Sequence, residues 1–217
     1  MFSRSFIIFT LISVVLFGLF PQIDLEVSRF FYRSSEGFYL RDLWLFHFLY
    51  RYVALLLGIP LLVLIGLFLY QFFSKKEFKH LNRRAIAFML SALLIGPGIV
   101  TNLFLKEHYG RARPVHVSEF GGEKHFTPFY QPTDQCAHNC SFVSGHVSAA
   151  LFFLTFAFVY RSKKLLWLAL AFSALMALTR VVQGAHFLSD VLFAFIINYA
   201  IFVWLYKLFF REVPRFE

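Results

Sequence analysis

At 217 residues, with 59% hydrophobic and only 15% charged residues, the chain has too little polar surface for a soluble globular domain. Its formal net charge of +9 would suit nucleic-acid binding. The basic residues, however, lie in clusters between apolar blocks and not along one amphipathic face, which argues against a nucleic-acid partner. The composition therefore predicts a single all-α membrane domain over residues 1–217, with roughly six spans of about 20 residues each.

The apolar residues are gathered in six blocks, each of which is interpreted as one span. The first block, residues 6–20, follows Arg4 and ends before Pro21, so a cleavable signal peptide is one interpretation. Signal peptidase needs small residues before its cleavage site, and Leu19 and Phe20 are bulky, so we expect this block to remain as the first span. The later blocks are residues 52–73, 85–105, 147–160, 165–182 and 191–208.

Charged side chains are almost absent from these blocks. Within them they are confined to Arg180 and Lys207, each close to the end of its block. This is the expected distribution, since a charge at the bilayer centre costs about 2.5 to 3.5 kcal/mol. Because the blocks are continuous and do not alternate apolar with polar residues, they indicate helices and not barrel strands. Pro60 and Pro97 are expected to kink the second and third helices.

The short connections carry the orientation signal. Basic residues concentrate at 75–84 and 161–164, and they also precede the first block and end the chain. The positive-inside rule then makes these connections and both termini cytoplasmic, as an even number of spans requires. The outer side receives residues 21–51, residues 106–144 and the turn near Gly184.

Two features of the predicted outer side have open interpretations. Cys136 and Cys140 lie four residues apart, which fits a disulfide outside the cytoplasm or half of a metal site. One such pair is a weak zinc signal even with His138 between the cysteines, so no metal is expected. Basic residues of the first outer connection fit contacts with an anionic head group or simple interfacial snorkelling; they are Arg29, Arg33 and Arg41.

Lys106 and Arg113 form the first of three polar groups on that side. Their spacing of seven residues places them on one helical face if the third helix continues, before Pro114 discourages further helix. Snorkelling at the end of a span is the alternative.

The second group, Ser144-Gly145-His146, opens the fourth span. Free backbone N–H groups and the positive end of the helix dipole attract an anion at such a point, although a plain helix cap has the same composition.

The third group combines Arg180 with His186 and Asp190, which can share a helical face at a spacing of four. The carboxylate would fix the imidazole tautomer and leave the other ring nitrogen as a nucleophile; a structural pair is the alternative. The three groups together supply cations, backbone donors, two imidazoles and a carboxylate. That inventory suits phosphoryl transfer without a metal.

These groups resemble the three motifs of the type 2 phosphatidic acid phosphatase (PAP2) superfamily of membrane lipid phosphatases. The motifs are present as Lys106-x6-Arg113-Pro114, Ser144-Gly145-His146 and Thr179-Arg180-x5-His186-x3-Asp190. The family usually has proline at the position of Val143 and serine at that of Thr179, and neither departure removes a reactive group.

The resemblance implies a six-helix bundle with histidine chemistry and no cofactor. His186 would attack phosphorus and form a phosphohistidine, Asp190 would orient it, and His146 would protonate the leaving oxygen. The substrate phosphate would be held by Lys106, Arg113, Ser144, Gly145 and Arg180.

Residues 135–143, with Gly96-Pro97-Gly98 and Arg113-Pro114-Val115, resemble bacterial lipid A phosphatases, particularly those of the 4′-phosphatase type. This implies a phosphorylated lipid substrate at the periplasmic face of the inner membrane, with no nucleic-acid or protein partner. Phosphatidylglycerophosphate and undecaprenyl pyrophosphate, substrates of similar enzymes, remain alternatives. A non-enzymatic transporter of anionic lipids would need the cations but no nucleophile together with a proton donor.

Overall fold

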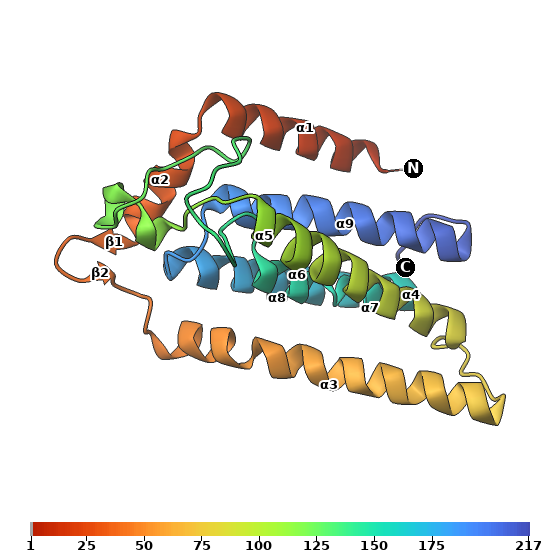
Figure 1. Ribbon diagram of the computed structural model, residues 1–217. Helices are drawn as coiled ribbons and strands as arrows, with labels where there is room; N and C mark the ends of the chain where they lie inside the picture. The colour runs from red at the N-terminus through yellow and green to blue at the C-terminus, as the bar shows by residue number, and fades with distance from the viewer. Residues whose placement is uncertain (1) are drawn as a thin grey trace.

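Long helices dominate the computed structural model, which describes residues 2–217 (Figure 1). Four helical runs within the described residues are long and apolar enough to cross a membrane. They are α3 (Trp44–Ser74), the run Arg83–His108, α8 (Lys163–Val182) and α9 (Leu188–Phe210).

Two further predicted spans are present in altered form. The helices α1 (Arg4–Leu19) and α2 (Gln22–Phe30) pass the same test only together, and they are bent by 88° at Pro21. The helices α6 (Gly145–Leu151) and α7 (Leu154–Tyr160) make a shorter apolar run. The described residues thus hold four candidate spans, or five with the bent pair, where the sequence predicts six.

The third predicted span changes its hydrogen bonding along its length. It begins as α4 (Arg83–Leu93), continues as the π-helix η1 (Leu94–Leu105) and ends as α5 (Lys106–His108). Pro97 lies within the π-helical part, where its missing N–H interrupts the α pattern. Pro60, by contrast, lies inside the uninterrupted α3.

The short elements all belong to the connections between helices. The strands β1 (Tyr32–Arg33) and β2 (Gly37–Phe38) form an antiparallel hairpin. The 3₁₀ helices η2 (Pro114–His116) and η3 (Ser118–Phe120) follow the third span.

The helix α3 begins at Trp44, eight residues before the predicted block 52–73. The extra residues include His47 and Arg51, whose polarity ends the apolar block without ending the helix. A helix needs no apolar residues where it passes out of the hydrocarbon layer.

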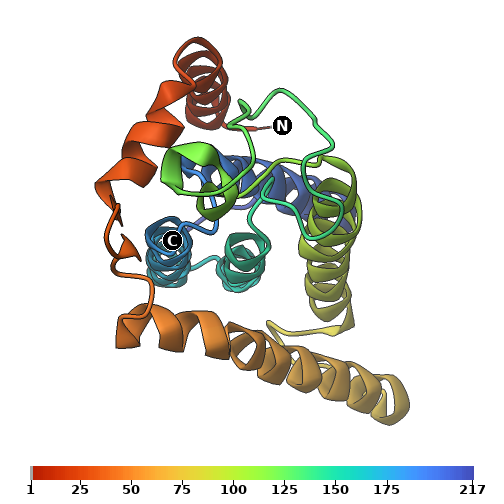
Figure 2. The same ribbon diagram turned by 60° about the vertical axis from the view of Figure 1, so that its left-hand side comes forward.

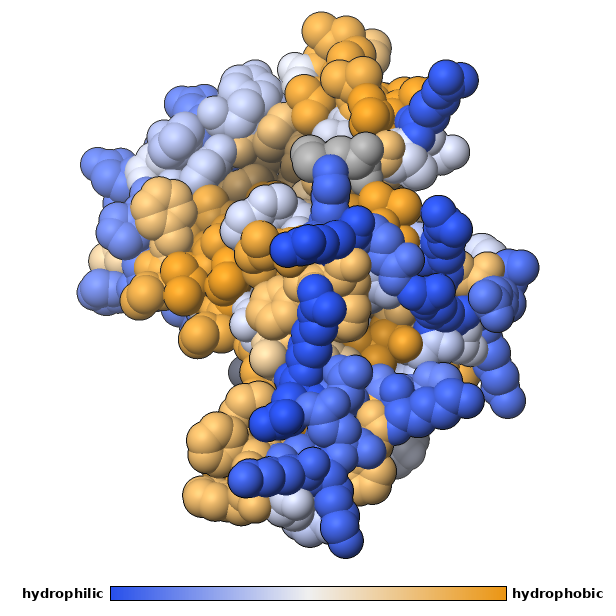
Figure 3. All heavy atoms as spheres, turned by 90° about the vertical axis from the view of Figure 1, so that its right-hand side faces the viewer, coloured by the Kyte–Doolittle hydropathy of each residue, from blue (hydrophilic) through white to orange (hydrophobic). Residues whose placement is uncertain are grey.

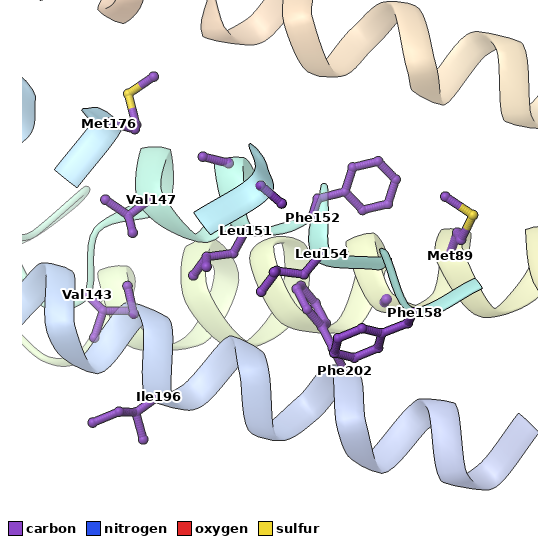
Figure 4. Packing of buried hydrophobic residues seen from close by; sticks show 14 of the residues in the cluster. Met89, Val143, Val147, Leu151, Phe152, Leu154, Phe158, Met176, Ile196 and Phe202 are labelled. Atoms are coloured by element: carbon purple, nitrogen blue, oxygen red, sulfur yellow. The ribbon is translucent and has the colours of Figure 1, made fainter. Parts of the chain in front are cut away.

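The short run α6–α7 occupies the middle of the bundle (Figures 1 and 2). It packs against α8, α9, η1 and α3, while α1 and α3 lie on opposite sides of the molecule. Figure 4 shows buried side chains of this core, among them Leu151, Leu154, Phe158 and Phe202. Since α6–α7 is enclosed by other helices, its N-terminus lies among protein groups and not at a lipid-facing surface.

The two ends of the bundle differ in what they carry. Both chain termini and the connection between α3 and α4 lie at one end, here called the terminal end (Figure 1). Figure 3 faces that end, where many hydrophilic residues gather. The other end, here called the loop end, carries α2, the β1–β2 hairpin and residues 109–144 (Figure 1). The sides of the helices expose apolar residues, and only 11% of the most apolar part of α3 is buried.

Candidate active site

All three sequence motifs meet at the loop end of the bundle. Lys106 stands at the start of α5, Ser144 is the N-cap of α6, and Arg180 lies in the last turn of α8. His186 lies in the turn between α8 and α9, and Asp190 is in the first turn of α9. Residues far apart in sequence are therefore brought to one point.

His186 is fully buried, and its two ring nitrogens have different surroundings. Nδ1 donates a hydrogen bond to the Ser141 carbonyl oxygen at 2.7 Å, which leaves the lone pair on Nε2. Nε2 has no hydrogen-bond partner among the described residues. Burial lowers the pKa of His186 to about 3, although Asp190 opposes the shift, so the imidazole is neutral at physiological pH.

Asp190 supports His186 in a way that differs from the expected shared helical face. α9 begins only at Leu188, so His186 precedes the helix. Asp190 Oδ2 accepts hydrogen bonds from the Ser141 hydroxyl at 2.5 Å and the Phe187 N–H at 2.9 Å, and it lies 3.7 Å from His186 Nδ1. Ser141 therefore fixes the tautomer, and Asp190 supplies a nearby negative charge.

Arg111 holds the other oxygen of Asp190 and is itself completely buried. Its Nη1 lies 2.6 Å from Asp190 Oδ1, and its Nη2 lies 2.9 Å from Asp24 Oδ2. Burial alone would lower the pKa of the Arg111 guanidinium, but the two carboxylates raise it above its usual range. Asp24 also accepts hydrogen bonds from the Ser189 N–H and hydroxyl, so α2 is fastened to the start of α9.

Lys106 and Arg113 meet through Asn139 and not along one helix. The helix ends at His108, and Arg113 has an extended backbone, so the helix does not continue and the two residues share no helical face. Gly110, with φ of +69°, turns the chain there, and Thr133 O would lie 1.5 Å from a Cβ at this position. Lys106 Nζ donates to Asn139 Oδ1 at 2.5 Å, and Arg113 Nη2 donates to the Asn139 carbonyl at 2.8 Å.

The segment around Asn139 is closed by a disulfide between Cys136 and Cys140, whose Cα atoms are 5.6 Å apart. The Cys140 N–H donates to the Lys106 carbonyl, and the Ser141 N–H donates to the Arg111 carbonyl. Residues 139–141 thus connect the first motif with the His186–Asp190 pair.

Ser144, Gly145 and His146 lie where the fourth predicted span begins. Ser144 is buried, and its hydroxyl has no hydrogen-bond partner among the described residues. A Cβ on Gly145 would come within 3.2 Å of Lys106 Cε, which shows how closely the first motif approaches this backbone. The Ser144 N–H donates to the Asp190 carbonyl at 3.3 Å, joining the second motif to the third.

His146 and Arg180 are connected through Tyr50 of α3. The His146 and Tyr50 rings are stacked with centroids 5.1 Å apart, and the Arg180 guanidinium lies 4.8 Å from the Tyr50 centroid. Arg180 Nη1 donates to Gln183 Oε1 at 2.5 Å, while its buried Nε has no partner among the described residues. The His186 N–H donates to the Arg180 carbonyl at 3.3 Å.

A polar network inside the bundle supports the start of α6. The Ser148 hydroxyl donates to the Ser144 carbonyl at 2.9 Å and receives hydrogen bonds from Thr101 and Asn198. Such groups need protein partners, because lipid chains offer none. The network fixes the backbone on which Ser144 stands.

A polar cavity of about 350 Å³ opens beside these residues. Arg113 and Arg180 line it together with Tyr50, so the motif cations face accessible space. Three buried polar atoms of the motif residues lack protein partners within residues 2–217: His186 Nε2, Ser144 Oγ and Arg180 Nε. Buried polar atoms are normally hydrogen-bonded, and these are of the kinds that bind a phosphate or attack it.

Metal-ligating residues do not cluster in the part of the chain that the structure describes. No group of three or more His, Cys, Asp or Glu side chains there is arranged to hold an ion. Catalysis without a metal stays a prediction from the sequence.

The comparison with family models agrees with the motifs. The model described as the PAP2 superfamily matches residues 84–214, more than half of the chain. The chain belongs to the PAP2 superfamily. The family resemblance predicted from the sequence is thus confirmed.

Similar PAP2 proteins are named as lipid A phosphatases. The chain is 38% identical to the lipid A 4′-phosphatase of Francisella tularensis subsp. novicida over 209 residues, which is 91% of each chain. It is 32% identical over 212 residues to the lipid A 4′-phosphatase of Rhizobium etli, covering 90% of this chain and 82% of that one. A lipid A 1-phosphatase of Rhizobium etli is 36% identical over 104 residues, 48% of this chain and 41% of that one. No solved structure matches the chain.

Several residues that shape this PAP2 site were not predicted from the sequence. They are Asp24, Tyr50, Arg111, Asn139 and Ser141. Arg111 could have been suspected as a site residue, because it follows Gly110 at a helix end and lies two residues before a motif arginine. Asp24 and Tyr50 could not, since they reach the site through the folding of α2 and α3.

Proposed function

We propose that this PAP2 protein removes the 4′-phosphate from lipid A at the periplasmic face of the bacterial inner membrane, through a phosphohistidine at His186. The observation that carries the proposal is the buried, neutral His186, whose Nε2 has no hydrogen-bond partner among the described residues. It lies in one cluster with the motif cations and the Ser144 hydroxyl. The substrate is supported by relatives named lipid A 4′-phosphatase, whose alignments cover 90% or more of this chain.

The membrane arrangement in this proposal has six crossing segments. The four long helical runs are joined by the bent pair α1–α2 and by the enclosed run α6–α7. Basic residues between α3 and α4 lie with both termini at the terminal end, which favours a cytoplasmic position for that end (Figures 1 and 3). The loop end, with the disulfide and the site, is then periplasmic.

In the first half-reaction, His186 Nε2 attacks the phosphorus atom in line with the bond to the sugar oxygen. The N–P bond forms as the P–O bond breaks, and His146, which takes up a proton when the anionic phosphate is bound, gives that proton to the leaving oxygen. The imidazole becomes positively charged as the bond forms. Asp190, at 3.7 Å from Nδ1, stabilises that charge, and the Ser141 carbonyl keeps the ring in position.

In the second half-reaction, water attacks the phosphohistidine while His146 accepts its proton. The N–P bond breaks, inorganic phosphate leaves, and His186 returns to its neutral form. The phosphoryl oxygens carry negative charge throughout, and preorganised donors lower the barrier because they stabilise this charge. These donors are Lys106, Arg113, Ser144, the Gly145 N–H and Arg180.

The decisive experiment replaces the nucleophile. His186→Ala should reduce phosphate release from lipid A by at least about a thousandfold, because no other group takes its place. Purified wild type, quenched during turnover with phosphate-labelled lipid A, should carry an acid-labile and base-stable label that His186→Ala lacks. His108→Ala, at an exposed histidine of α5, is the matched control and should behave as wild type. Activity of His186→Ala near the wild-type level would refute the mechanism.

A substrate panel separates the competing functions. Lipid A, phosphatidylglycerophosphate, undecaprenyl pyrophosphate and phosphatidic acid would each be given to the purified protein in detergent, and phosphate release measured. We expect the highest kcat/KM for lipid A. A higher kcat/KM for another lipid would identify that lipid as the substrate. If the protein bound these lipids but released phosphate from none of them, the transporter would be favoured.

A further inference from the structure

The polar cavity beside the motif cations extends well beyond the space that a phosphate needs. Its volume of about 350 Å³ corresponds to about a dozen water molecules at roughly 30 Å³ each. A phosphate group has only five heavy atoms. The remaining space must accept the part of the substrate to which the phosphate is bonded.

The walls of the cavity come from two different parts of the chain. Arg113, Arg180 and Gln183 form one wall and belong to the region matched by the family model. The second wall comes from the connection before α3 and from the first turns of α3, outside residues 84–214. Its lining residues are Arg41, Asp42, His47 and Tyr50.

The charges of the second wall indicate what it contacts. Arg41 adds a third guanidinium to those of Arg113 and Arg180, which suits the neighbourhood of an anionic head group. Asp42 is the one carboxylate among the lining residues. A carboxylate repels a second phosphate, but it accepts hydrogen bonds from hydroxyl groups. The wall therefore fits a hydroxylated group next to a single phosphate better than a pyrophosphate.

We propose that this cavity is a sugar-binding subsite, in which Asp42 and His47 hydrogen-bond the hydroxyl or amide N–H groups of the sugar that carries the phosphate. The inference rests on the proposed function, because it takes the phosphorylated lipid to be a glycolipid. It assigns substrate selection to the wall outside the region matched by the family model, while the motif residues carry out the chemistry.

The comparisons agree with this division. The lipid A 4′-phosphatase alignments cover 90% or more of this chain, so they include the segment from Arg41 to Tyr50. The superfamily model, by contrast, matches only residues 84–214. A wall that lies outside this region but within those alignments is suited to distinguish one phosphorylated lipid from another.

The test measures sugar recognition and phosphate binding separately in the purified full-length protein. Asp42→Ala should raise KM for lipid A by about tenfold to a hundredfold, because a hydrogen bond to a charged group is lost. Inorganic phosphate lacks the sugar and is expected to bind through the motif residues, so its inhibition constant should stay unchanged or become lower. His47→Ala should act in the same direction, and Asp42→Asn should lie between Asp42→Ala and wild type.

Glu36→Ala is the matched control, since this exposed carboxylate lies in the same connection but not in the cavity. Its KM should equal that of wild type. An unchanged KM in Asp42→Ala and His47→Ala would overturn the subsite, as would a parallel loss of phosphate binding. Wild-type protein that releases no phosphate from lipid A would instead refute the proposed function, and with it this inference.

Discussion

Arg111 and Asp190 form an ion pair in which both side chains are fully buried, with Nη1 2.6 Å from Oδ1. Asp24 completes the pair from α2, a helix that is distant in sequence from both. Two carboxylates thus share one guanidinium behind His186. Buried charges are costly unless they are paired and hydrogen-bonded, and here the Ser189 and Ser141 hydroxyls supply the additional hydrogen bonds.

This arrangement predicts a large effect of Asp24→Ala on stability. The variant removes one of the two carboxylates that compensate Arg111 and also leaves the Ser189 N–H without its acceptor. We expect a loss of about 3 to 5 kcal/mol, the usual cost of breaking a buried pair. Thermal unfolding of the purified protein in detergent measures it. The control is Glu26→Ala on the same helix, where an exposed pair with Arg29 should contribute less than about 1 kcal/mol. Equal unfolding midpoints for the two variants would contradict the role given to Asp24.

A substitution of Asn139 is expected to change activity and not stability, because Asn139 is exposed and holds side chains of the site. Its backbone has φ of +51°, so glycine can replace it without strain while the amide that binds Lys106 is lost. Asn139→Gly should lower kcat/KM by about tenfold through a higher KM, since a cation held in place binds phosphate better than a mobile one. The unfolding midpoint should hardly change.

Two further variants make the Asn139 measurement specific. His138→Ala removes a neighbouring exposed side chain that pairs with Glu107, and it should leave KM as in wild type. Asn139→Asp keeps the oxygen that accepts from Lys106 and should recover part of the loss. If all three variants had the same KM, Asn139 would have no role in positioning Lys106.

The sequence predicted the features that local chemistry determines. Apolar runs located the membrane helices, because a long apolar segment in lipid satisfies its backbone hydrogen bonds only as a helix. The motif spacing identified residues that meet at one end of the bundle. The apolar pattern could not predict the bend of 88° between α1 and α2 at Pro21, because α2 is held by contacts with distant parts of the chain, such as the ion pair of Asp24 with Arg111. It also could not predict that the 147–160 run is enclosed, since enclosure is a property of the neighbouring helices.

Two local geometries in the site were predicted wrongly for the same reason. Helical periodicity placed Lys106 with Arg113 and His186 with Asp190, although a turn interrupts the helix at Gly110 and α9 starts only after His186. The paired side chains still come together, through Asn139 in one case and Ser141 in the other. Periodicity gives relations within a helix, whereas these contacts pass through a third segment.

Gly145 is predicted to accept a side chain only if Asn102 or Lys106 moves. A Cβ there would lie 2.6 Å from Asn102 Oδ1 and 3.2 Å from Lys106 Cε, so Gly145→Ala must displace one of them. We expect kcat/KM to fall by about tenfold or more and stability by about 1 to 3 kcal/mol, the usual cost of overpacking. Gly18→Ala in α1 is the matched control, with no atom within 4 Å of the added carbon. A Gly145→Ala enzyme as active as wild type would mean that Lys106 can move without loss.

The lowered pKa of His186 predicts how stability changes with pH. In the unfolded chain the imidazole takes up a proton near pH 6.5, whereas in the folded protein burial keeps it neutral down to about pH 3. Between these values the unfolded state binds more protons, so the contribution of His186 to stability is present above pH 6.5 and decreases as the pH falls.

His186→Gln removes this titration and keeps a polar side chain of similar length. The unfolding midpoint of wild type should therefore fall more than that of His186→Gln when the pH is lowered from 7.5 to 5, in the same detergent and salt. His108→Gln, at an exposed histidine, serves as the control for the loss of one imidazole and should follow wild type. Parallel curves for wild type and His186→Gln would show that His186 takes up its proton equally in both states. The pH dependence of unfolding would then give no evidence that His186 is neutral in the folded protein, as the proposed mechanism requires.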